Sequence, residues 1–271
     1  MAKLKKLANT KYFMTILWIV ILIAVWEVFA VIVAHTKRTP ENILPHLGGI
    51  LKSVFSQKSI NGGQTAFQMV MANAAATLSR AGIGYLFGIV CGFALALLMS
   101  LWKGIEKIAF PYLMLIQMIP ILGMAPIINA LTGDINKSRI IIAAILTFYP
   151  VATNTLAGFK SVIKEKHELM YSYASGKIRV YTKLMLPSCV PYFFTGLKIS
   201  APMAITASIL VDTLQGGVGL GCLLSQALKG AMTRYVFWQI IFFSAIIGIL
   251  SFSVMGLLEY ILCPYKRTQK N

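Results

Sequence analysis

The chain has 271 residues, of which 58% are hydrophobic and only 12% are charged. Soluble domains carry roughly 25% charged residues, so the composition excludes an ordinary soluble protein and indicates a membrane protein. A bilayer core about 30 Å thick needs roughly 20 apolar residues for each helical span. Several stretches meet that length, and we predict an all-α, polytopic membrane bundle of about six transmembrane helices.

The formal net charge is +17, from 25 Lys and Arg residues against 8 Asp and Glu residues. No basic stripe interleaves with exposed aromatic residues, so membrane lipid is the expected partner and nucleic acid is not. The four cysteines form no CxxC pair and the three histidines are scattered. Neither a metal site nor a disulfide framework is therefore predicted.

The first predicted span covers residues 12–34 and follows several lysines. It is too long for the apolar region of a cleavable signal peptide. Thr39 and Pro40 then predict the start of an amphipathic helix over about residues 40–57, because Thr is a good N-cap and Pro suits the first helical position. Such a helix is suited to the membrane surface.

Further spans follow along the chain. The third contains Pro111, Pro120 and Pro126, so we expect it to be kinked or locally unwound. A glycine-rich loop over residues 216–221 follows the fifth span. These later spans are predicted over about residues 81–101, 109–131, 140–159, 190–214 and 236–262.

Basic residues are distributed unevenly between the segments that connect the spans. With the N-terminus placed in the cytoplasm, sixteen of the 25 Lys and Arg residues fall on the cytoplasmic side and nine on the other. Cytoplasmic loops carry an excess of Lys and Arg, so both termini are predicted to be cytoplasmic. The nine outer residues are Lys37, Arg38, Lys52, Lys58, Arg80, Lys137, Arg139, Lys229 and Arg234.

No nucleotide-binding loop is recognisable. Gly176-Lys177 resembles the end of a phosphate-binding loop, but Ile178 follows it and Tyr171 stands where the pattern needs glycine. No arrangement of Ser, His and Asp, or of Cys and His, has a supporting context. The chain is therefore not expected to be an enzyme or to hold a cofactor of its own.

Two carboxylates stand out within predicted spans, Glu27 and Asp212. A charged group at the bilayer centre costs roughly 2.5–3.5 kcal/mol on insertion scales. Such a group either lines a polar pathway or forms a hydrogen bond or ion pair between helices. Pro120 and Pro126 have the same two interpretations, since the backbone groups that they free can face a pathway or merely permit a kink.

The segment over residues 160–187 combines several Lys and Glu residues with apolar residues. This mixture predicts short amphipathic helices on the cytoplasmic face. A long charged loop with its own apolar pattern is more often a docking surface than a simple connector.

The order of residues in this segment resembles the cytoplasmic EAA loop of the permeases of ATP-binding-cassette (ABC) importers. That loop reads Glu-Ala-Ala, three residues, Gly, nine residues, Ile, one residue, Leu-Pro. Here Leu and Met replace the two alanines, Ala replaces the glycine and Leu replaces the isoleucine. The matching positions are Glu168, Leu169, Met170, Ala174, Leu184, Leu186 and Pro187.

The likeness extends over about residues 18–262 and is greatest to the sulfonate, taurine and nitrate branch of these permeases. Asp212 falls where that branch usually has Glu, and Gly219-Leu220-Gly221 matches its Gly-Leu-Gly. Further similar residues are Trp26-Glu27, Leu78-Ser79-Arg80, Pro120, Ala125-Pro126, Tyr149-Pro150, Asn154-Thr155 and Gly196-Leu197-Lys198-Ile199. We include Asn154 among the candidate pathway or interhelical residues.

This resemblance implies a type I importer permease with one transmembrane domain over residues 1–271, whose core covers about 75–262. The span over 12–34 and the helix over 40–57 would be peripheral. The permease would form a homodimer in the bacterial cytoplasmic membrane. It would pair with two cytoplasmic ATPase subunits, which would bind Mg-ATP, and with an extracytoplasmic substrate-binding protein.

The loop over 160–187 would then contain the helix that couples the permease to the ATPase. Small residues such as Ala174 and Gly176 would allow close approach to the partner, and Leu169 and Met170 would need a matching groove. The cargo would be a small organic solute or anion. Glu168-Leu169-Met170 and the residues 191–198 look more like members that import thiamine precursors or riboflavin-like heterocycles.

Two alternatives remain open. The first is a secondary transporter driven by an ion gradient, in which Glu27 and Asp212 would bind protons or sodium. Dependence of uptake on ATP distinguishes it from an importer. The second is a membrane scaffold or sensor, against which the lack of a soluble signalling domain counts.

Overall fold

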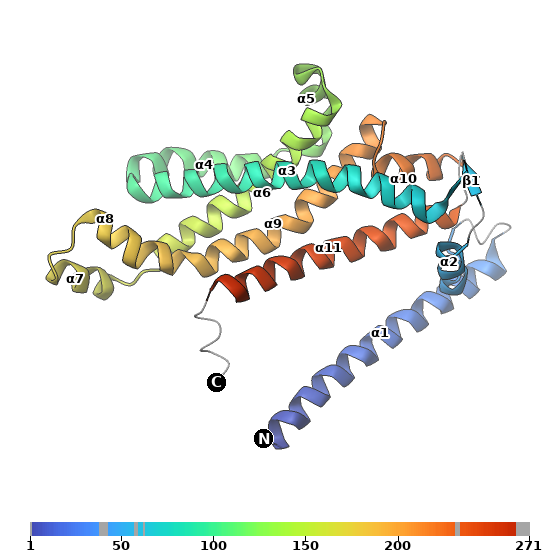
Figure 1. Cartoon of the computed structure of the whole chain (residues 1–271), viewed down its shortest axis with the longest axis horizontal. Helices are drawn as coiled ribbons and strands as arrows, with labels where there is room; N and C mark the ends of the chain where they lie inside the picture. Colours follow the sequence, from blue (N-terminus) through green and yellow to red (C-terminus); the bar gives the residue numbers. More distant parts are fainter. Residues whose placement is uncertain (1, 38–42, 57–58, 62, 231–233, 264–271) are drawn as a thin grey trace. The chain divides into compact units, whose positions relative to one another are not determined.

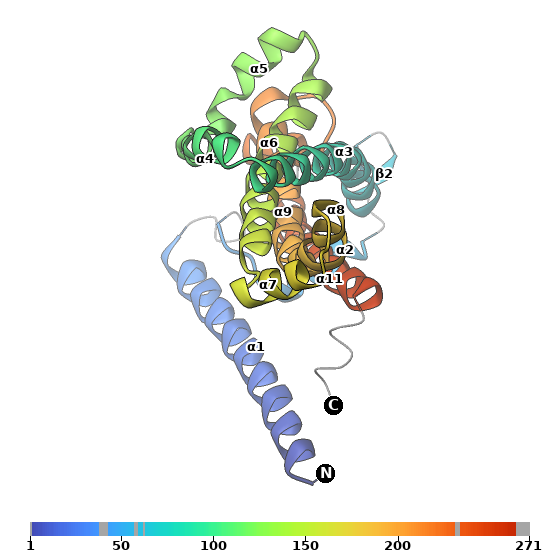
Figure 2. The same ribbon diagram turned by 90° about the vertical axis from the view of Figure 1, so that its left-hand side faces the viewer.

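The computed structural model describes residues 2–37, 43–56, 59–61, 63–230 and 234–263, most of them in helices (Figures 1 and 2). The chain divides into two compact units. Unit 1 comprises Met1–Val70 with Gln226–Gln239, and unit 2 comprises Met71–Ser225 with Ile240–Asn271. The long helices α3 (Ala66–Leu101) and α11 (Arg234–Leu262) each contribute to both units.

Unit 1 is built around α1 (Ala2–Thr36) and the short helix α2 (Leu47–Val54). Strands β1 (Ser59–Asn61) and β2 (Gln64–Thr65) form a small antiparallel pair after α2. The part of α1 from Phe13 onward is apolar on all sides and almost entirely exposed. A helix of this kind needs an apolar solvent around it, which the lipid bilayer supplies.

Helix α2 begins later than the predicted amphipathic helix over about 40–57. Thr39 and Pro40, its expected start, lie outside the described residues. Residues 43–46 are not helical and include Pro45, which has no N–H to donate within a helix. The helix therefore starts only after this proline, and it ends at Val54.

Unit 2 contains most of the helices, with α6 and α9 as its central pair. Figure 1 shows α6 and α9 between α3 and α11. The polar segment predicted to form short helices does so, as α7, α8 and the π-helical turn η3. The elements are α4 (Lys103–Met118), η2 (Ile121–Met124), α5 (Ala125–Thr132), α6 (Ile135–Lys160), α7 (Lys164–Ser172), α8 (Lys177–Val180), η3 (Tyr181–Met185), α9 (Leu186–Gln215) and α10 (Leu220–Leu228).

Five helical stretches of the described residues are long and apolar enough to cross a membrane. A sixth span results if α4 is counted together with Ile121–Thr132, which is bent by 80° relative to it. The bend lies at Ile119 and Pro120, as the prolines of the third span predict. The predicted all-α bundle of about six membrane helices is thus confirmed.

Three glycines of α3, Gly84, Gly88 and Gly92, lie against α6 at intervals of four residues. A Cβ atom added at Gly88 would lie 2.5 Å from the Cβ of Thr147 and 2.6 Å from the carbonyl oxygen of Ala144. Small residues at this spacing let two helix backbones approach closely. Because lipid is as apolar as the side chains, helices in a membrane associate through such close packing and not through the hydrophobic effect.

Helices α6 and α9 are joined in the same way. A Cβ atom at Gly158 of α6 would lie 2.8 Å from the Cα of Cys189, and one at Gly196 of α9 would lie 2.9 Å from the carbonyl oxygen of Pro150. Because both helices supply a glycine to their contact, neither can rotate about its axis without a steric clash. The two helices therefore form one rigid element.

We expect Gly88→Ala to lower the free energy of unfolding of the purified protein by about 1–3 kcal/mol, and its melting temperature with it, because the added methyl group forces α3 away from α6. The matched control is Gly82→Ala on the same helix, where an added Cβ meets no atom within 4 Å. This control should raise helix propensity and leave stability unchanged or higher. Equal melting temperatures for the two variants would contradict the packing described here.

Candidate functional site

Asp212, near the end of α9, is completely buried in unit 2. Its carboxylate accepts a hydrogen bond from the Thr77 hydroxyl of α3 at 2.7 Å. It also pairs with Arg139 Nε of α6 at 2.9 Å and with an Arg80 nitrogen of α3 at 3.4 Å. We call these four residues the Asp212 cluster. The cluster ties three spans together at one end of α9.

The two arginines of the cluster carry one more positive charge than Asp212 can neutralise. Their terminal nitrogens bind the loop after α9 and Asn136 of α6, whereas Arg80 Nε has no hydrogen-bond partner among the described residues. Arg80 donates to the carbonyl of Val218 at 2.6 Å and to Asn136 Oδ1 at 3.0 Å. Arg139 donates to the carbonyls of Gly216 and Val218. A buried charge is tolerated when its donors are paired in this way, so the cluster also fixes the loop.

The glycines of the predicted Gly-Leu-Gly motif make this arrangement possible. Gly219 has a φ of +152°, and a Cβ there would lie 2.1 Å from an Asp212 carboxylate oxygen. A Cβ at Gly221 would lie 1.9 Å from the carbonyl oxygen of Ile209. The start of α10 is therefore held by its backbone: the Leu220 N–H donates to Thr77 Oγ1 at 2.9 Å.

Further polar side chains complete the surroundings of the cluster. The Gln215 amide donates to the Ala125 carbonyl at 2.8 Å and to Ser138 Oγ at 3.0 Å, which links α9 to α5 and α6. Burial raises the pKa of the Cys222 thiol, so the thiol stays protonated and donates to the Asp212 carbonyl at 3.2 Å. These contacts make the Asp212 cluster an interhelical brace.

The coupling segment predicted over 160–187 has a well-defined turn between α7 and α8. Ser175 N–H donates to Met170 O at 3.1 Å, and Ala174 N–H donates to Tyr171 O at 2.8 Å. This pattern is a Schellman motif, which places the residue after the helix cap in the left-handed region. Ala174 takes that place with a φ of +49°.

The left-handed conformation explains why glycine is usual at the position of Ala174 in the loop that this segment resembles. An L residue with a Cβ costs roughly 1–2 kcal/mol there, whereas glycine does not. Gly176, by contrast, is extended and exposed as the residue before α8. Leu186 and Pro187 form the first turn of α9, directly after the π-helical turn.

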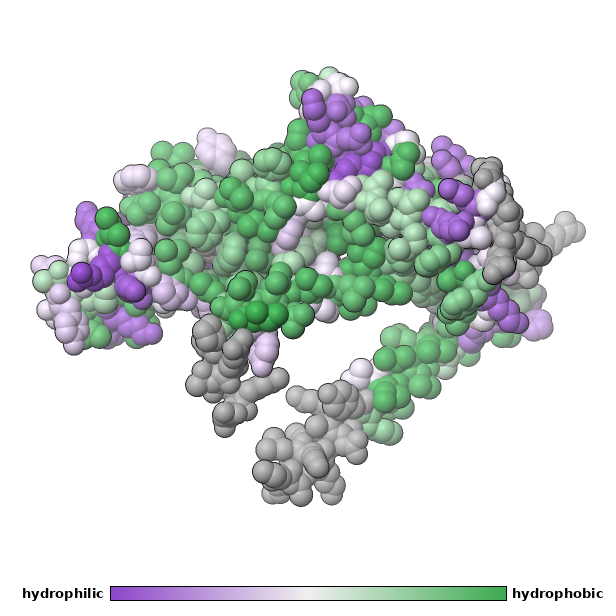
Figure 3. Space-filling model, viewed as in Figure 1, coloured by the Kyte–Doolittle hydropathy of each residue, from purple (hydrophilic) through white to green (hydrophobic). Residues whose placement is uncertain are grey.

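Several apolar side chains of this segment are exposed. Leu169, Tyr171, Tyr173 and Ile178 are each more than half exposed. Figure 3 shows hydrophilic side chains gathered over α7 and α8 with hydrophobic ones among them, next to the hydrophobic surface of the spans. Glu168 pairs with Lys164 at 3.4 Å on the surface of α7. Exposed apolar residues with a polar surround are typical of a protein-docking surface.

Glu27 lies in unit 1, far along the sequence from the other candidates. Its carboxylate accepts a hydrogen bond from the Leu47 N–H at 2.9 Å and lies 2.6 Å from His46 Nδ1. Beside it, the Trp26 indole donates to the Pro45 carbonyl at 3.1 Å and meets the Trp238 ring edge-on at 4.8 Å. The Glu27 side chain of α1 thus accepts a hydrogen bond from the first residue of α2, and Trp26 of α1 binds the segment directly before it. Both residues therefore hold α2 against α1.

Pro120, Pro126 and Asn154 occupy three different settings. Pro120 and Pro126 are exposed, at the break after α4 and in the first turn of α5. Asn154 lies at the contact between α6 and α9, and its amide donates to the Pro150 carbonyl at 2.7 Å. Within unit 2, these three residues are therefore not part of the Asp212 cluster.

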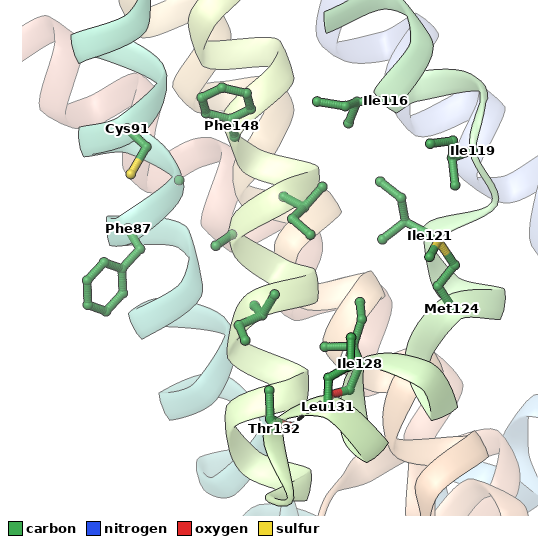
Figure 4. A pocket seen from close by; sticks show the side chains of 14 residues that line it. Phe87, Cys91, Ile116, Ile119, Ile121, Met124, Ile128, Leu131, Thr132 and Phe148 are labelled. Carbon is green, nitrogen blue, oxygen red and sulfur yellow. Dashed lines mark hydrogen bonds between the residues drawn. The ribbon is translucent and has the colours of Figure 1, made fainter. Parts of the chain in front are cut away.

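An apolar cavity of about 660 Å³ lies where α4 and α5 diverge from α3 and α6 (Figure 4). Phe87 and Cys91 of α3 line one side, and Ile116, Ile119 and Ile121 line the other. The cavity lies beside the break after α4, and Ile119 and Ile121 line it whereas Pro120 does not. The described residues contain no group of three or more His, Cys, Asp or Glu side chains placed to hold a metal.

Two sets of buried charged residues in unit 2 were missed by sequence reasoning. Arg80 and Arg139 were counted as outer loop charges, but they lie in α3 and α6 and are almost entirely buried. Glu259, near the end of the sixth predicted span, was not singled out. It is buried and paired with Lys198 of α9. Its signal was simply a carboxylate inside an apolar run.

The comparisons with known proteins identify the family. The model of the binding-protein-dependent transport system inner membrane component matches residues 84–261. The chain belongs to this family. It is accordingly a permease subunit of a binding-protein-dependent ABC importer and a multi-pass membrane protein. The importer permease that the EAA-like loop predicted is thereby confirmed, and the ion-driven transporter is not supported.

Curated relatives cover nearly the whole chain. The formylaminopyrimidine transport permease protein ThiX of Halalkalibacterium halodurans is 29% identical over 93% of this chain and 96% of its own. The nitrate import permease protein NrtB of a Synechocystis species is 24% identical over 91% and 87%. The putative aliphatic sulfonates transport permease protein SsuC of Bacillus subtilis is 24% identical over 92% and 86%.

Solved structures of importer permeases share the fold. A chain of an amino acid ABC transporter matches with a TM-score of 0.58 and 17% identity, over 72% of this chain and 93% of that one. A chain of the inward-facing MetNI methionine ABC transporter matches with a TM-score of 0.57 and 14% identity, over 71% and 95%. The predicted type I importer permease fold is confirmed.

We expect Asp212→Asn to reduce the yield and melting temperature of the permease, because two buried arginines then lose their carboxylate. Removing one partner of a buried ion pair costs about 3–5 kcal/mol. If Asp212 only lined a polar pathway, its replacement would leave folding normal and abolish uptake, whereas the cluster predicts a folding defect. Glu165→Gln, which removes an exposed carboxylate from α7, is the matched control for yield and melting temperature.

Fluorescence-detected size-exclusion chromatography with heating measures both effects, and uptake is normalised to folded protein. With Asp212 as a brace, uptake per folded Asp212→Asn molecule stays near normal. Full stability combined with lost uptake would instead assign Asp212 to the transport pathway.

Proposed function

We propose that this chain, as a homodimer, forms the transmembrane path of an ATP-driven importer in a bacterial cytoplasmic membrane. Two ATPase subunits bind Mg-ATP in the cytoplasm, and an extracytoplasmic binding protein delivers the cargo. The single observation that carries this proposal is the family match over residues 84–261. The chain itself contributes no nucleotide-binding loop, so the hydrolysis of ATP falls to the partner subunits.

The surface that receives the ATPase is the exposed part of α7 and the turn that follows it. Leu169 and Tyr173 supply apolar area there, and both are more than half exposed. The ion pair between Glu106 and Lys160 holds the start of α4 against the end of α6, directly before this segment. A short helix mounted on rigid spans can pass the motion of its partner to the membrane.

The orientation follows the positive-inside rule, with both termini and α7 in the cytoplasm. Since Arg80 and Arg139 are buried within spans, they do not belong to the outer loops. Nine outer basic residues less these two leaves seven, and sixteen inner ones less Lys198, which lies within the α9 span and pairs with Glu259, leaves fifteen. The bias toward cytoplasmic termini is therefore larger than the sequence count indicated.

A small organic solute or anion is the proposed cargo. Similarity to ThiX over 93% of the chain favours a formylaminopyrimidine-like heterocycle as the first compound to test. The similarity to NrtB supports an oxyanion as the second.

Reconstituted proteoliposomes test the energy source. They contain this permease with an ATPase and a binding protein from the same genome, and they receive radiolabelled formylaminopyrimidine, nitrate or an aliphatic sulfonate. We expect uptake of one compound to require internal ATP and to survive ionophores that abolish ion gradients. Uptake driven by a proton or sodium gradient without ATP would instead support the secondary transporter.

We expect Ala174→Trp to insert and dimerise normally but to lose the ATPase during purification, because a bulky ring at the turn blocks close approach. Ala174→Gly is the matched control. It removes the strain of a left-handed alanine, so the purified protein should be about 1 kcal/mol more stable and should retain the ATPase. Pull-down of the tagged permease followed by quantification of the bound ATPase measures both effects. Normal ATPase recovery and uptake with Ala174→Trp would remove this turn from the interface.

A further inference from the structure

A groove of about 1270 Å³ lies in unit 2 between the end of α3 and the segment that runs from α7 to the start of α9. We call it the α3–α7 groove. One face of α7 lines it, through Lys164, His167, Glu168, Tyr171 and Ser172. Their spacing of three and four residues puts them on one side of a helix.

The side of the groove formed by α7 and α8 is polar and carries a positive balance. Lys164, His167 and Lys177 line it, and Glu168 is the one carboxylate among the described lining residues. Glu168 pairs with Lys164 at 3.4 Å and offsets that charge. Lys177 remains as a surplus positive charge, and the hydroxyls of neighbouring residues add further donors. This combination suits an anionic group with several oxygen atoms.

The α3 side of the groove is apolar. Leu97 and Leu101 belong to the last turns of a membrane span, and Trp102 follows directly with 55% of its surface exposed. Met185 and Leu186 line the groove from the start of α9. Tryptophan is enriched at the boundary between hydrocarbon and headgroups. The apolar side thus begins where the α3 span ends.

We propose that the α3–α7 groove binds an anionic phospholipid of the inner leaflet, with its phosphate at Lys177 and His167 and its acyl chains along Leu97, Leu101 and Trp102. Basic pockets beside transmembrane helices on the cytoplasmic side recognise anionic headgroups in this way. The volume exceeds the roughly 300–1,000 Å³ of ordinary small-molecule pockets. The proposal rests on the cytoplasmic placement of α7, which is part of the proposed function.

The faces of α7 separate this lipid from the ATPase. Leu169 is exposed but does not line the groove, and neither does Tyr173 beyond the end of the helix. Leu169 and Tyr173 therefore remain available to the ATPase outside the groove, whereas Tyr171 and Ile178, which are also exposed, line the groove on the lipid side. Phospholipid in the groove would support the coupling helix from its membrane side. Coupling would then depend on the lipid composition of the membrane.

Native mass spectrometry of the full-length permease, delipidated in detergent and titrated with lipid, tests the proposal. Phosphatidylglycerol and phosphatidylcholine with the same acyl chains are compared. We expect phosphatidylglycerol to bind more tightly, and Lys177→Glu to weaken it roughly tenfold while leaving phosphatidylcholine unchanged. Soluble glycerol phosphate should not displace the lipid, because it lacks the apolar part.

Lys183→Glu is the matched control, since Lys183 is an exposed lysine of the same segment that does not line the groove. It should retain the preference for phosphatidylglycerol. Equal affinity for the two lipids, an equal effect of Lys183→Glu, or displacement by glycerol phosphate would each overturn the proposal.

The ATPase is tested separately, by co-purification with the same variants. Release of the ATPase by Lys177→Glu with lipid preference retained would assign the groove to the protein partner and overturn the proposal. If the wild-type permease retains no ATPase yet prefers phosphatidylglycerol, the docking part of the proposed function fails and the lipid site stands.

Discussion

The buried negative charge of Asp212 is the constraint on which the membrane core depends. Its carboxylate lies between two arginines from two other spans, and each arginine also holds the loop after α9. In a low-dielectric interior, losing any one partner leaves a charge without compensation. The relative axial positions of α3, α6 and α9 are therefore fixed at this end. A side chain at position 219 would displace the carboxylate, and one at position 221 would clash with the backbone of α9 at Ile209.

Close packing between helices also fixes the positions of α3, α6 and α9 relative to one another farther along the spans. Glycines of α3 meet α6, and Gly158 and Gly196 join α6 to α9. The segment that includes α7 and α8 connects α6 to α9 in the chain, so a force on its turn reaches both helices at once. Because these helices interlock through backbone contacts rather than flexible side chains, they transmit the force as one body. This is the mechanical property that a coupling segment requires.

Some features of the fold could be predicted from the sequence and others could not, and the reasons are physical. The kink in the third span was predicted because proline acts locally on its own helix. The amphipathic helix was predicted too long because Pro45 interrupts it before Leu47. The glycine replaced by Ala174 was noticed, but its role was interpreted as close approach to a partner. Only the Schellman hydrogen bonds reveal the left-handed backbone that the position requires.

The sequence by itself determined the membrane class, the spans, the polar segment with its short helices and the family, because each depends on local composition or on the order of residues. The tertiary structure decided which charged residues meet. Arg80 and Asp212 are 132 positions apart, and Lys198 and Glu259 are 61 apart. Hydropathy can flag a charge within an apolar run, but its partner depends on how the helices cross. That crossing is set by glycine contacts and side-chain packing, which exist only in the folded chain.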